Sequence, residues 1–429
     1  MNHQTWQTCI VLLFWIATLG MGEHMARAVE TGQPLLSLAA LIEEAKAKNP
    51  EIQAARQRWE VAKARIPQVQ TLPDPIIGLT YRGPDIMREG RLHLQQEIPF
   101  PGKLSLKGEI ARKAADQAEQ IYRAVQLRVI AQLKEAYFTL HFIQKSIEVV
   151  KKNLVILKEL EKTAEARYQV GKGIQQDVFR AQVELSREIE QLTALEQERE
   201  SVRAEINRIL NQPPMQPLGV PEEPTLTRLP YTLEDLNTIA QEHSPLLRGH
   251  IHDIARGQSA VDLAQREYFP DFVVSLGAMQ SFRSADLQDA FGMLGIKVPL
   301  YYATKQRFGE KEALADLERA RRDYRTVLQT VLFQVKDNFV RAQRAARLVK
   351  LIGKAIVPQA SLALESSMAG YAVGKVDFLT LLDNVLSLQQ DELDLHRQKT
   401  DHEIAIAKLE AIIGQPLQPL LQDQPYQPQ

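Results

Sequence analysis

A tight break between two long helical runs occurs twice in this chain, and that duplication limits the fold more than any other feature. Residues 167–173 read Arg-Tyr-Gln-Val-Gly-Lys-Gly, and residues 370–375 read Gly-Tyr-Ala-Val-Gly-Lys. The shared Tyr, Val, Gly and Lys recur 203 residues apart, and Ser244-Pro245 follows Asn49-Pro50 by 195 residues. A solenoid repeat is much shorter, about 20–50 residues. We therefore expect a duplicated domain.

The first half contains a long uninterrupted helical run. Residues 103–169 include no proline and one glycine, Gly108, which predicts a single helix of 67 residues. At about 1.5 Å per residue it would be about 100 Å long. The returning run, 174–211, is too short to pair along all of it. A helix predicted over 37–70, with a pause at Pro50, has the missing length, so we expect the two shorter helices to stack end to end along the long one.

The second half repeats this arrangement. Its periodicity predicts helices over 232–269 and 376–413, and a long run over 304–369 with Gly353 and Pro358 as kink sites. Each half is therefore expected to be a rod of helices about 100 Å long, with two strands at one end and a hairpin at the other.

Each half also has two short segments in which apolar and polar residues alternate, which predicts four strands, at 77–81, 91–98, 272–282 and 290–300. In the second segment Leu92, Leu94 and Ile98 would lie on one face, and the opposite face would carry Arg91, His93, Gln95 and Glu97. A strand of this kind has one apolar face and one wet face.

Four strands cannot close a barrel, and an open sheet edge cannot face lipid. Packed as a small sheet, the strands would suit a soluble protein. In a membrane, closure must come from other copies, and bacterial barrels have about eight or more strands. Two copies would supply the minimum, whereas three would supply twelve strands and leave room for a pore. We therefore favour a homotrimer.

The N-terminus has the pattern of a secretory signal peptide. An apolar run from Cys9 to Met21 is followed by Ala26-Arg27-Ala28, a small-x-small cleavage site. The predicted organisation is a signal peptide at 1–28, a first repeat at 29–211, a proline-rich linker at 212–230, a second repeat at 231–414 and a tail at 415–429. Cleavage would remove the only cysteine of the chain.

Several functional classes are not favoured. The net charge of −1 gives no reason to expect nucleic acid as a partner. No Ser-His-Asp order, phosphate loop or HExxH motif accompanies the numerous carboxylates, so we expect no enzyme and no cofactor. His250 and His252 are two residues apart on a predicted helix and would point to different faces, which favours surface histidines over a metal site.

Four motifs resemble the TolC family of outer-membrane efflux channels, and the last two are similar to its heavy-metal (cobalt-zinc-cadmium type) branch. They are the paired Tyr-x-Val-Gly-Lys hairpins, Asn-Pro-Glu-Ile-x-Ala-Ala-Arg (49–56), Leu-Pro-Asp-Pro (72–75) and Gln-Glu-Ile-Pro-Phe-Pro-Gly-Lys (96–103). The resemblance implies a mainly α fold with a small membrane β part. Duplicated helical hairpins would form a periplasmic α-barrel, and four strands per chain would contribute to a trimeric twelve-stranded β-barrel in outer-membrane lipid.

The resemblance also implies partners and roles. The channel would be a passive duct for heavy-metal cations, coupled through a periplasmic adaptor (membrane fusion) protein to an inner-membrane RND-type pump. Drug efflux and type I protein secretion are the alternatives for its cargo. A soluble periplasmic coiled-coil adaptor or scaffold is the alternative of another class, and it would leave the amphipathic strands unexplained.

Matching the hairpins to the family assigns the site residues. Adaptor docking would fall on the two tips, Val170, Gly171, Lys172 and Val373, Gly374, Lys375, although both lysines also suit an ordinary turn. A resting gate would pair Asp177 with Tyr371, and the pore would narrow at Thr380 and Asp383. The alternative is that Asp177 serves only the helix dipole at the start of the return helix.

Overall fold

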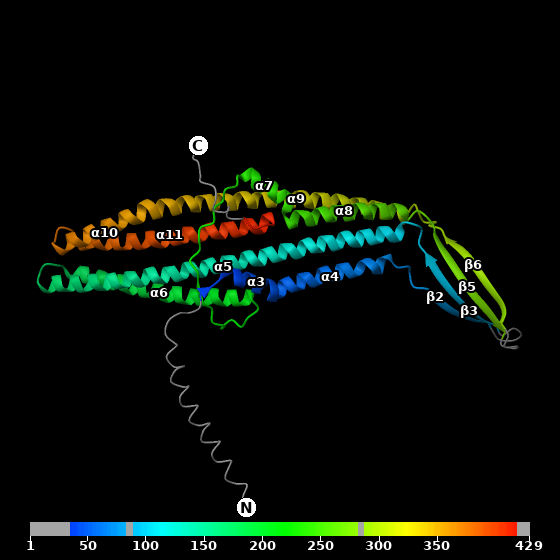
Figure 1. Ribbon diagram of the computed structural model, residues 1–429, viewed down its shortest axis with the longest axis horizontal. Helices are drawn as coiled ribbons and strands as arrows, with labels where there is room; N and C mark the ends of the chain where they lie inside the picture. Colours follow the sequence, from blue (N-terminus) through cyan, green and yellow to red (C-terminus); the bar gives the residue numbers. More distant parts are fainter. Residues whose placement is uncertain (1–34, 83–88, 282–286, 418–429) are drawn as a thin grey trace, which may run out of the picture.

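A computed structural model describes residues 35–82, 89–281 and 287–417 (Figure 1). The predicted signal peptide at 1–28 and most of the predicted tail lie outside the described residues. The helices are α3 (Leu38–Lys48), α4 (Pro50–Gln70), α5 (Lys103–Gln169), α6 (Gln175–Ile209), α7 (Leu233–His243), α8 (Pro245–Arg266), α9 (Gln306–Leu351), α10 (Val357–Ala372) and α11 (Phe378–Ile413). The strands are β1 (Leu35–Leu36), β2 (Ile76–Arg82), β3 (Glu89–Ile98), β4 (Val220–Pro221), β5 (Asp271–Ser281) and β6 (Leu287–Lys297).

Helix α5 is the spine of the first half, and its 67 residues match the predicted run. Helices α4 and α6 both pack against it, one beyond the other, which confirms the predicted end-to-end stacking (Figure 1). Asn49 joins the two. Its Oδ1 accepts from the N–H groups of Glu51 and Ile52 and so caps α4, while its Nδ2 donates to the carbonyl of Ile209 at the end of α6.

In the second half, α9 and α10 are separated by a short π-helix, Ile352–Ile356. It contains Gly353 and ends two residues before Pro358, so the helix departs from regular α geometry in the region where kinks were predicted. The end of α11 meets the junction of α7 and α8 at Gly414, whose φ is +87°. A Cβ at this glycine would lie 2.4 Å from the carbonyl oxygen of His243, so only glycine fits here.

The core is divided into three clusters along the rod. One surrounds Leu133 and Leu140 of α5, a second lies near the hairpins between α5, α6, α10 and α11, and a third joins α7, α8, α9 and α11. Since burying one large aliphatic side chain stabilises by about 1.5–3 kcal/mol, the three clusters hold the helices together from the middle of the rod to the hairpins.

The four longer strands form one antiparallel sheet in the order β2-β3-β5-β6 at one end of the rod. The prediction for 272–282 is off by one residue and that for 290–300 by three, because β6 runs from Leu287 to Lys297. The final apolar residues of the predicted segment lie in the following turn. A proline there, Pro299, has no N–H to donate to a ladder.

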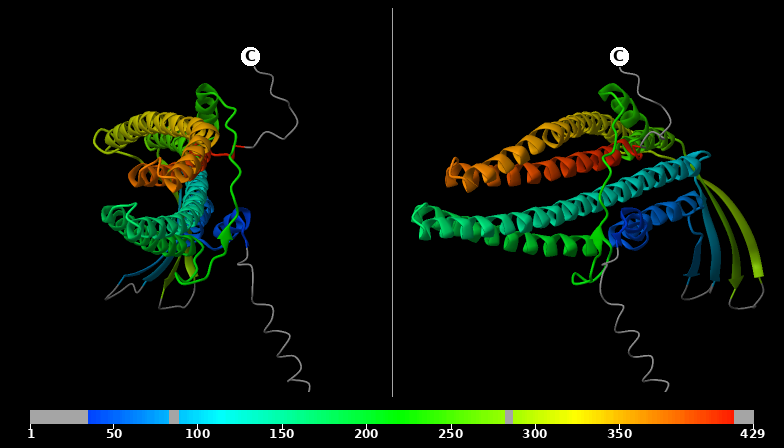
Figure 2. Two further views of the ribbon diagram at one scale, coloured as in Figure 1. Left: turned by 90° about the vertical axis from the view of Figure 1, so that its left-hand side faces the viewer. Right: turned by 60° about the vertical axis from the view of Figure 1, so that its left-hand side comes forward.

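The linker between the halves crosses the helices as a strap (Figures 1 and 2). Its residues Val220–Pro221 pair in parallel with Leu35–Leu36, a small sheet that the sequence analysis did not predict. The strap is also fixed at Thr227, whose N–H and hydroxyl donate to Glu403 at 2.7 and 2.8 Å. The two halves are therefore tied together near the middle of the rod.

Candidate functional site

The two hairpin tips have the same backbone conformation. Gly171 and Gly374 have φ of +71° and +78°. In the first tip Gly171 N–H donates to Tyr168 O at 3.0 Å and Lys172 N–H to Arg167 O at 2.8 Å. The second tip makes the equivalent bonds, from Gly374 to Tyr371 and from Lys375 to Gly370. This pair of bonds, closed by a left-handed glycine, is a Schellman C-cap.

The side chains of both tips are available to a partner. Val170 and Val373 are 67% and 69% exposed, and Lys172 and Lys375 are exposed beside them. An exposed valine is not needed to form the turn, so its presence at both tips sets these residues apart from an ordinary solubilising loop.

Arg167 joins the two hairpins. Its Nη1 donates to the backbone carbonyl of Tyr371, and its guanidinium carbon lies 4.6 Å from the centre of the tyrosine ring. This contact spans the two repeats, and the sequence analysis missed it. The residue 203 positions after Arg167 is Gly370, so the duplication gives no second arginine that would have marked it.

The structure places the predicted gate residues Asp177 and Tyr371 in this same region. Asp177 is the third residue of α6, and Tyr371 is buried near the end of α10. Burial raises the pKa of Asp177, and the nearby Asp377 adds to the rise while Arg180 opposes it. Burial also raises the pKa of Tyr371; Arg167 opposes that rise and the Asp177 carboxylate adds to it. The Asp177 carboxylate is thus near enough to influence the Tyr371 phenol, although no hydrogen bond joins the two side chains in the described part of the chain.

The predicted narrowing residues Thr380 and Asp383 lie on the first two turns of α11. The Thr380 hydroxyl donates to Asp377 at 3.0 Å, and Asp377 in turn accepts from the Thr380 N–H at 2.8 Å as the helix cap. Asp383 is exposed and lines a groove of about 650 Å³ between α6 and α11. Exposed Phe179, Val183 and Leu379 line the same groove.

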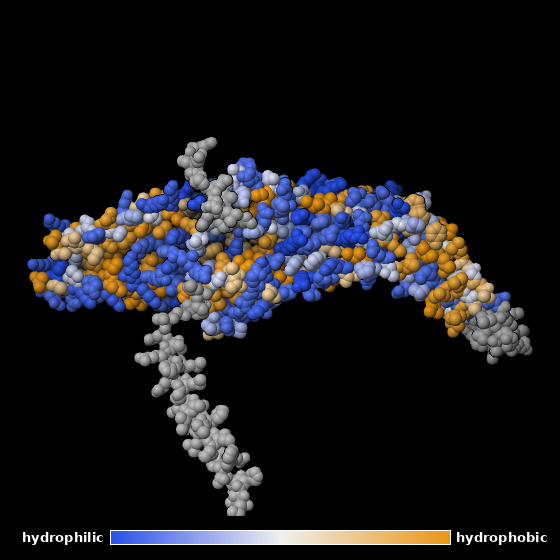
Figure 3. Space-filling view, viewed as in Figure 1, coloured by the Kyte–Doolittle hydropathy of each residue, from blue (hydrophilic) through white to orange (hydrophobic). Residues whose placement is uncertain are grey.

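At the other end of the rod, the sheet has one apolar face. The register aligns Ile77 with Leu94, Leu94 with Leu276, and Leu79 with Leu92, so these residues share one side. The same side of β6 carries Leu294 and Ile296, 74% and 60% exposed. Figure 3 shows hydrophobic residues gathered over the sheet and its junction with the helices. This confirms the predicted face of the second strand.

The opposite face carries polar and ring side chains. A row across the sheet runs Gly78, His93, Gly277, Phe291. A Cβ at Gly78 would lie 2.3 Å from the His93 ring, and one at Gly277 would lie 2.4 Å from the Phe291 ring. Each ring therefore lies over a glycine of the neighbouring strand, and the sheet accepts large side chains on this face without separating its strands.

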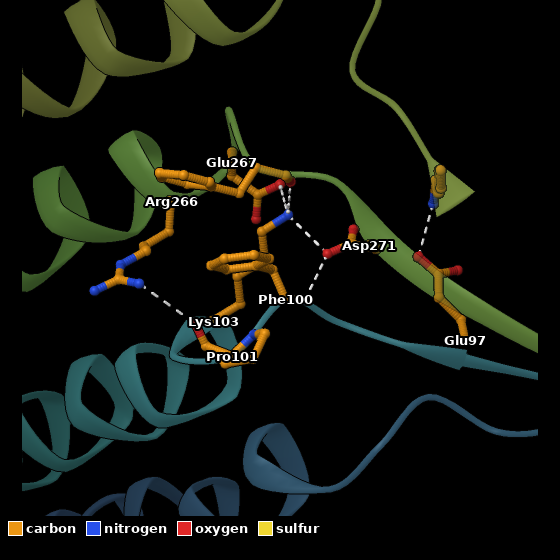
Figure 4. Close-up of polar contacts among 9 residues, drawn as sticks. Glu97, Phe100, Pro101, Lys103, Arg266, Glu267 and Asp271 are labelled. Carbon is orange, nitrogen blue, oxygen red and sulfur yellow. Dashed lines mark hydrogen bonds and ion pairs between the residues drawn. The ribbon is translucent and has the colours of Figure 1, made fainter. Parts of the chain in front are cut away.

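The sheet meets the helices at a buried lysine (Figure 4). The Lys103 side chain is 3% exposed, and its Nζ donates to Asp271 Oδ1 at 2.8 Å and to the Phe269 carbonyl at 2.9 Å. Asp271 also accepts from the Phe100 N–H at 2.8 Å, and the Phe100 and Phe269 rings stack with centroids 4.8 Å apart. Lys103 and Phe100 belong to the first repeat and their partners to the second, so this junction locks the halves together.

Two features are absent from the described residues. No helix in residues 35–82, 89–281 and 287–417 is long and apolar enough to cross a membrane. Within the same ranges no group of three or more His, Cys, Asp or Glu side chains is arranged to hold a metal ion.

Comparisons with known proteins match both halves of the chain. Residues 41–212 and 236–415 each match the family described as outer membrane efflux protein. The cobalt-zinc-cadmium resistance protein CzcC of Cupriavidus metallidurans is 22% identical over 362 residues, which cover 83% of this chain and 84% of that protein. The outer membrane protein TolC of Vibrio cholerae is 26% identical over 413 residues, which cover 88% and 90%. The crystal structure of CusC superposes with a TM-score of 0.76 at 16% identity, covering 90% of this chain and 96% of CusC.

Proposed function

Because this chain belongs to the family of outer membrane efflux proteins, we propose that three copies close into one passive export duct that spans the outer membrane and extends into the periplasm. The family match over both halves is the observation that carries this proposal. The open sheet supports it, since β2 and β6 are outer strands and three copies would supply twelve strands. A soluble adaptor or scaffold would leave the exposed apolar face unexplained.

The hairpin tips are the proposed contact with a periplasmic adaptor, which in turn would contact an inner-membrane RND-type pump. The exposed valine, glycine and lysine of each tip support this role. Replacing Gly171 with Val would strain a left-handed turn whose surroundings are otherwise open. We expect weaker crosslinking to the adaptor without loss of the assembled channel, whereas unchanged crosslinking together with unchanged export would remove the tip from the contact.

The gate is proposed to lie next to the hairpin tips, where α10 ends and α6 and α11 begin. A hydrogen bond from a phenol to a carboxylate is strong yet breakable, and the effect of the Asp177 carboxylate on the Tyr371 phenol supports this pairing. Asp383 would give a ring of three carboxylates in the trimer. Thr380, in the other narrowing position, carries no charge and is already engaged by Asp377.

The proposed cargo is heavy-metal cations. The similarity to CzcC supports this choice, and metal selectivity is assigned to the pump rather than to the duct. The test is deletion of the gene in its host, followed by growth on graded zinc, cobalt, cadmium and copper and on a panel of drugs. Sensitivity to metals that the intact gene reverses supports the proposal. Sensitivity to drugs alone would assign drug efflux, and loss of a secreted protein would assign type I secretion.

A further inference from the structure

The junction around Lys103 is made once within the chain, although its two charged components each occur twice. Lys305 follows Lys103 by 202 residues, the same distance that separates Tyr122 from Tyr324 on the helices that begin there. Asp271 likewise follows Asp74 by 197 residues. Within the chain, Lys103 of the first repeat reaches Asp271 of the second. The complementary pair, Lys305 of the second repeat and Asp74 of the first, has no such contact.

Lys305 and Asp74 lie on opposite flanks of the chain. Asp74 precedes the outer strand β2, and Lys305 follows the outer strand β6. Their helices are also the outer ones, since α4 packs on α5, α5 on α8 and α8 on α9 (Figures 1 and 2). Both side chains are exposed, and neither forms an ion pair with any residue of the described part of the chain. They cannot meet within one copy.

The apolar surroundings of the junction are unpaired in the same way. Inside the chain, Phe269 stacks on Phe100. Its repeat counterpart Leu72 is 43% exposed, and the turn that matches the one at Phe100 carries Leu300 and Tyr302, 77% and 62% exposed. Each outer side of the chain therefore exposes the residues that match one partner of the Lys103–Asp271 junction.

We propose that the boundary between neighbouring copies repeats the internal junction, with Lys305 of one copy bound to Asp74 of the next, and Leu72 covered by the turn that contains Leu300 and Tyr302. The partner is a second copy of this chain. The inference rests on the proposed closed ring. In such a ring first and second repeats alternate, so every boundary, within a copy or between copies, places a first repeat beside a second repeat.

The correspondence between the two repeats also fixes the strand register between copies. Within the chain, Gln96 of β3 is opposite Val274 of β5. Ile296 lies 200 residues after Gln96, and Ile77 lies 197 residues before Val274. Ile296 of one copy is therefore opposite Ile77 of the next. Both residues lie on the apolar face, so this register keeps that face continuous around the ring, whereas a shift of one residue would turn the next strand inside out.

The first test exchanges the charges. The full chain is expressed in outer membranes, extracted in mild detergent, and its oligomer is followed by native electrophoresis with increasing temperature. We compare Lys305→Glu, Asp74→Lys and the double variant with Arg307→Glu, a control at an exposed basic residue on the same turn. A partly exposed ion pair contributes about a factor of three in equilibrium constant. Three boundaries together should then shift ring dissociation about 30-fold for each single variant, and the double variant should restore it.

A second test does not depend on the ion pair. Ile77→Cys combined with Ile296→Cys should form covalent trimers on mild oxidation, and Ile76→Cys with Ile296→Cys should form far fewer, because the exposed Ile76 lies on the other face of the sheet. If the native chain assembles but the two single charge variants behave like the Arg307 control, or the wrong cysteine pair crosslinks equally well, this inference is wrong and the proposed function stands. If the native chain forms no oligomer, the ring and the inference fall together.

Discussion

Replacing Lys103 with Met should destabilise the protein more than any exposed lysine replacement, because it removes one partner of a buried ion pair. Breaking such a pair costs about 3–5 kcal/mol, since the remaining charge is left without its partner. Asp271 keeps the Phe100 N–H at 2.8 Å and its side chain is 16% exposed, which places the expected loss at the lower end, about 3 kcal/mol. Met retains most of the lysine stem, so the loss reports the charge rather than a cavity.

The assay is guanidinium-induced unfolding of the detergent-extracted protein, followed by far-ultraviolet circular dichroism at one fixed protein concentration, because assembly contributes to apparent stability. Lys107→Met is the matched control: this lysine is exposed on the next turn of α5, and its replacement should change stability by less than about 0.5 kcal/mol. Lys103 also lies 3.5 Å from Glu267, but that side chain is 45% exposed and can be solvated. Adding Asp271→Asn to Lys103→Met therefore removes the more buried unpaired charge and should recover most of the loss. If Lys103→Met and Lys107→Met unfold at the same denaturant concentration, the junction does not hold the halves together and the reasoning is refuted.

Three further outcomes are expected. Leu94→Arg should lower the yield of heat-stable oligomer by placing a charge on the lipid face, at about 2–4 kcal/mol if the position is at mid-bilayer, while Gln95→Arg should be tolerated; equal effects would contradict the face assignment. Asp177→Ala with Tyr371→Phe should raise the resting conductance in a planar bilayer. Unchanged conductance would mean that Asp177 serves only to stabilise the helix dipole at the start of α6. Burial, helped by nearby Lys145, lowers the pKa of His141 from 6.5 to about 4, so its contribution to stability is complete above pH 6.5 and is lost as the pH falls towards 4. His141→Leu should therefore flatten the fall in unfolding midpoint over that range, and an unchanged slope would contradict this assignment.

Much of the fold follows from local patterns in the sequence. The boundaries of α5 could be predicted because no residue between Lys103 and Gln169 interrupts the helical period, and a left-handed glycine ends the hairpin. The stacking of α4 and α6 follows from length alone. Alternation alone places the end of β6 three residues too late, because the alternating pattern continues through Val298 into a turn and does not depend on hydrogen bonding.

The contacts between the two repeats could not be predicted in the same way. Arg167 and Tyr371 are far apart in sequence, as are Lys103 and Asp271, and none of these residues looks unusual among its neighbours. Their roles come from how the two halves are placed side by side, which depends on packing along the whole rod. The duplication singles out the tip residues, whereas nothing in the sequence distinguishes Lys103 from the rest of the motif at 96–103.

The π-helix at Ile352–Ile356 preserves the angular position of the second hairpin. Tyr324 follows Tyr122 by 202 residues, but Tyr371 follows Tyr168 by 203, so the second long helix is one residue longer than the first between these points. In a regular α-helix one extra residue would rotate everything beyond it by about 100°. A π-helical turn has i→i+5 hydrogen bonds and so holds one more residue than an α-helical turn. The side chains beyond it therefore keep the same direction around the helix axis. The π-helix therefore accommodates the extra residue, and Tyr371 contacts Arg167 across the two hairpins.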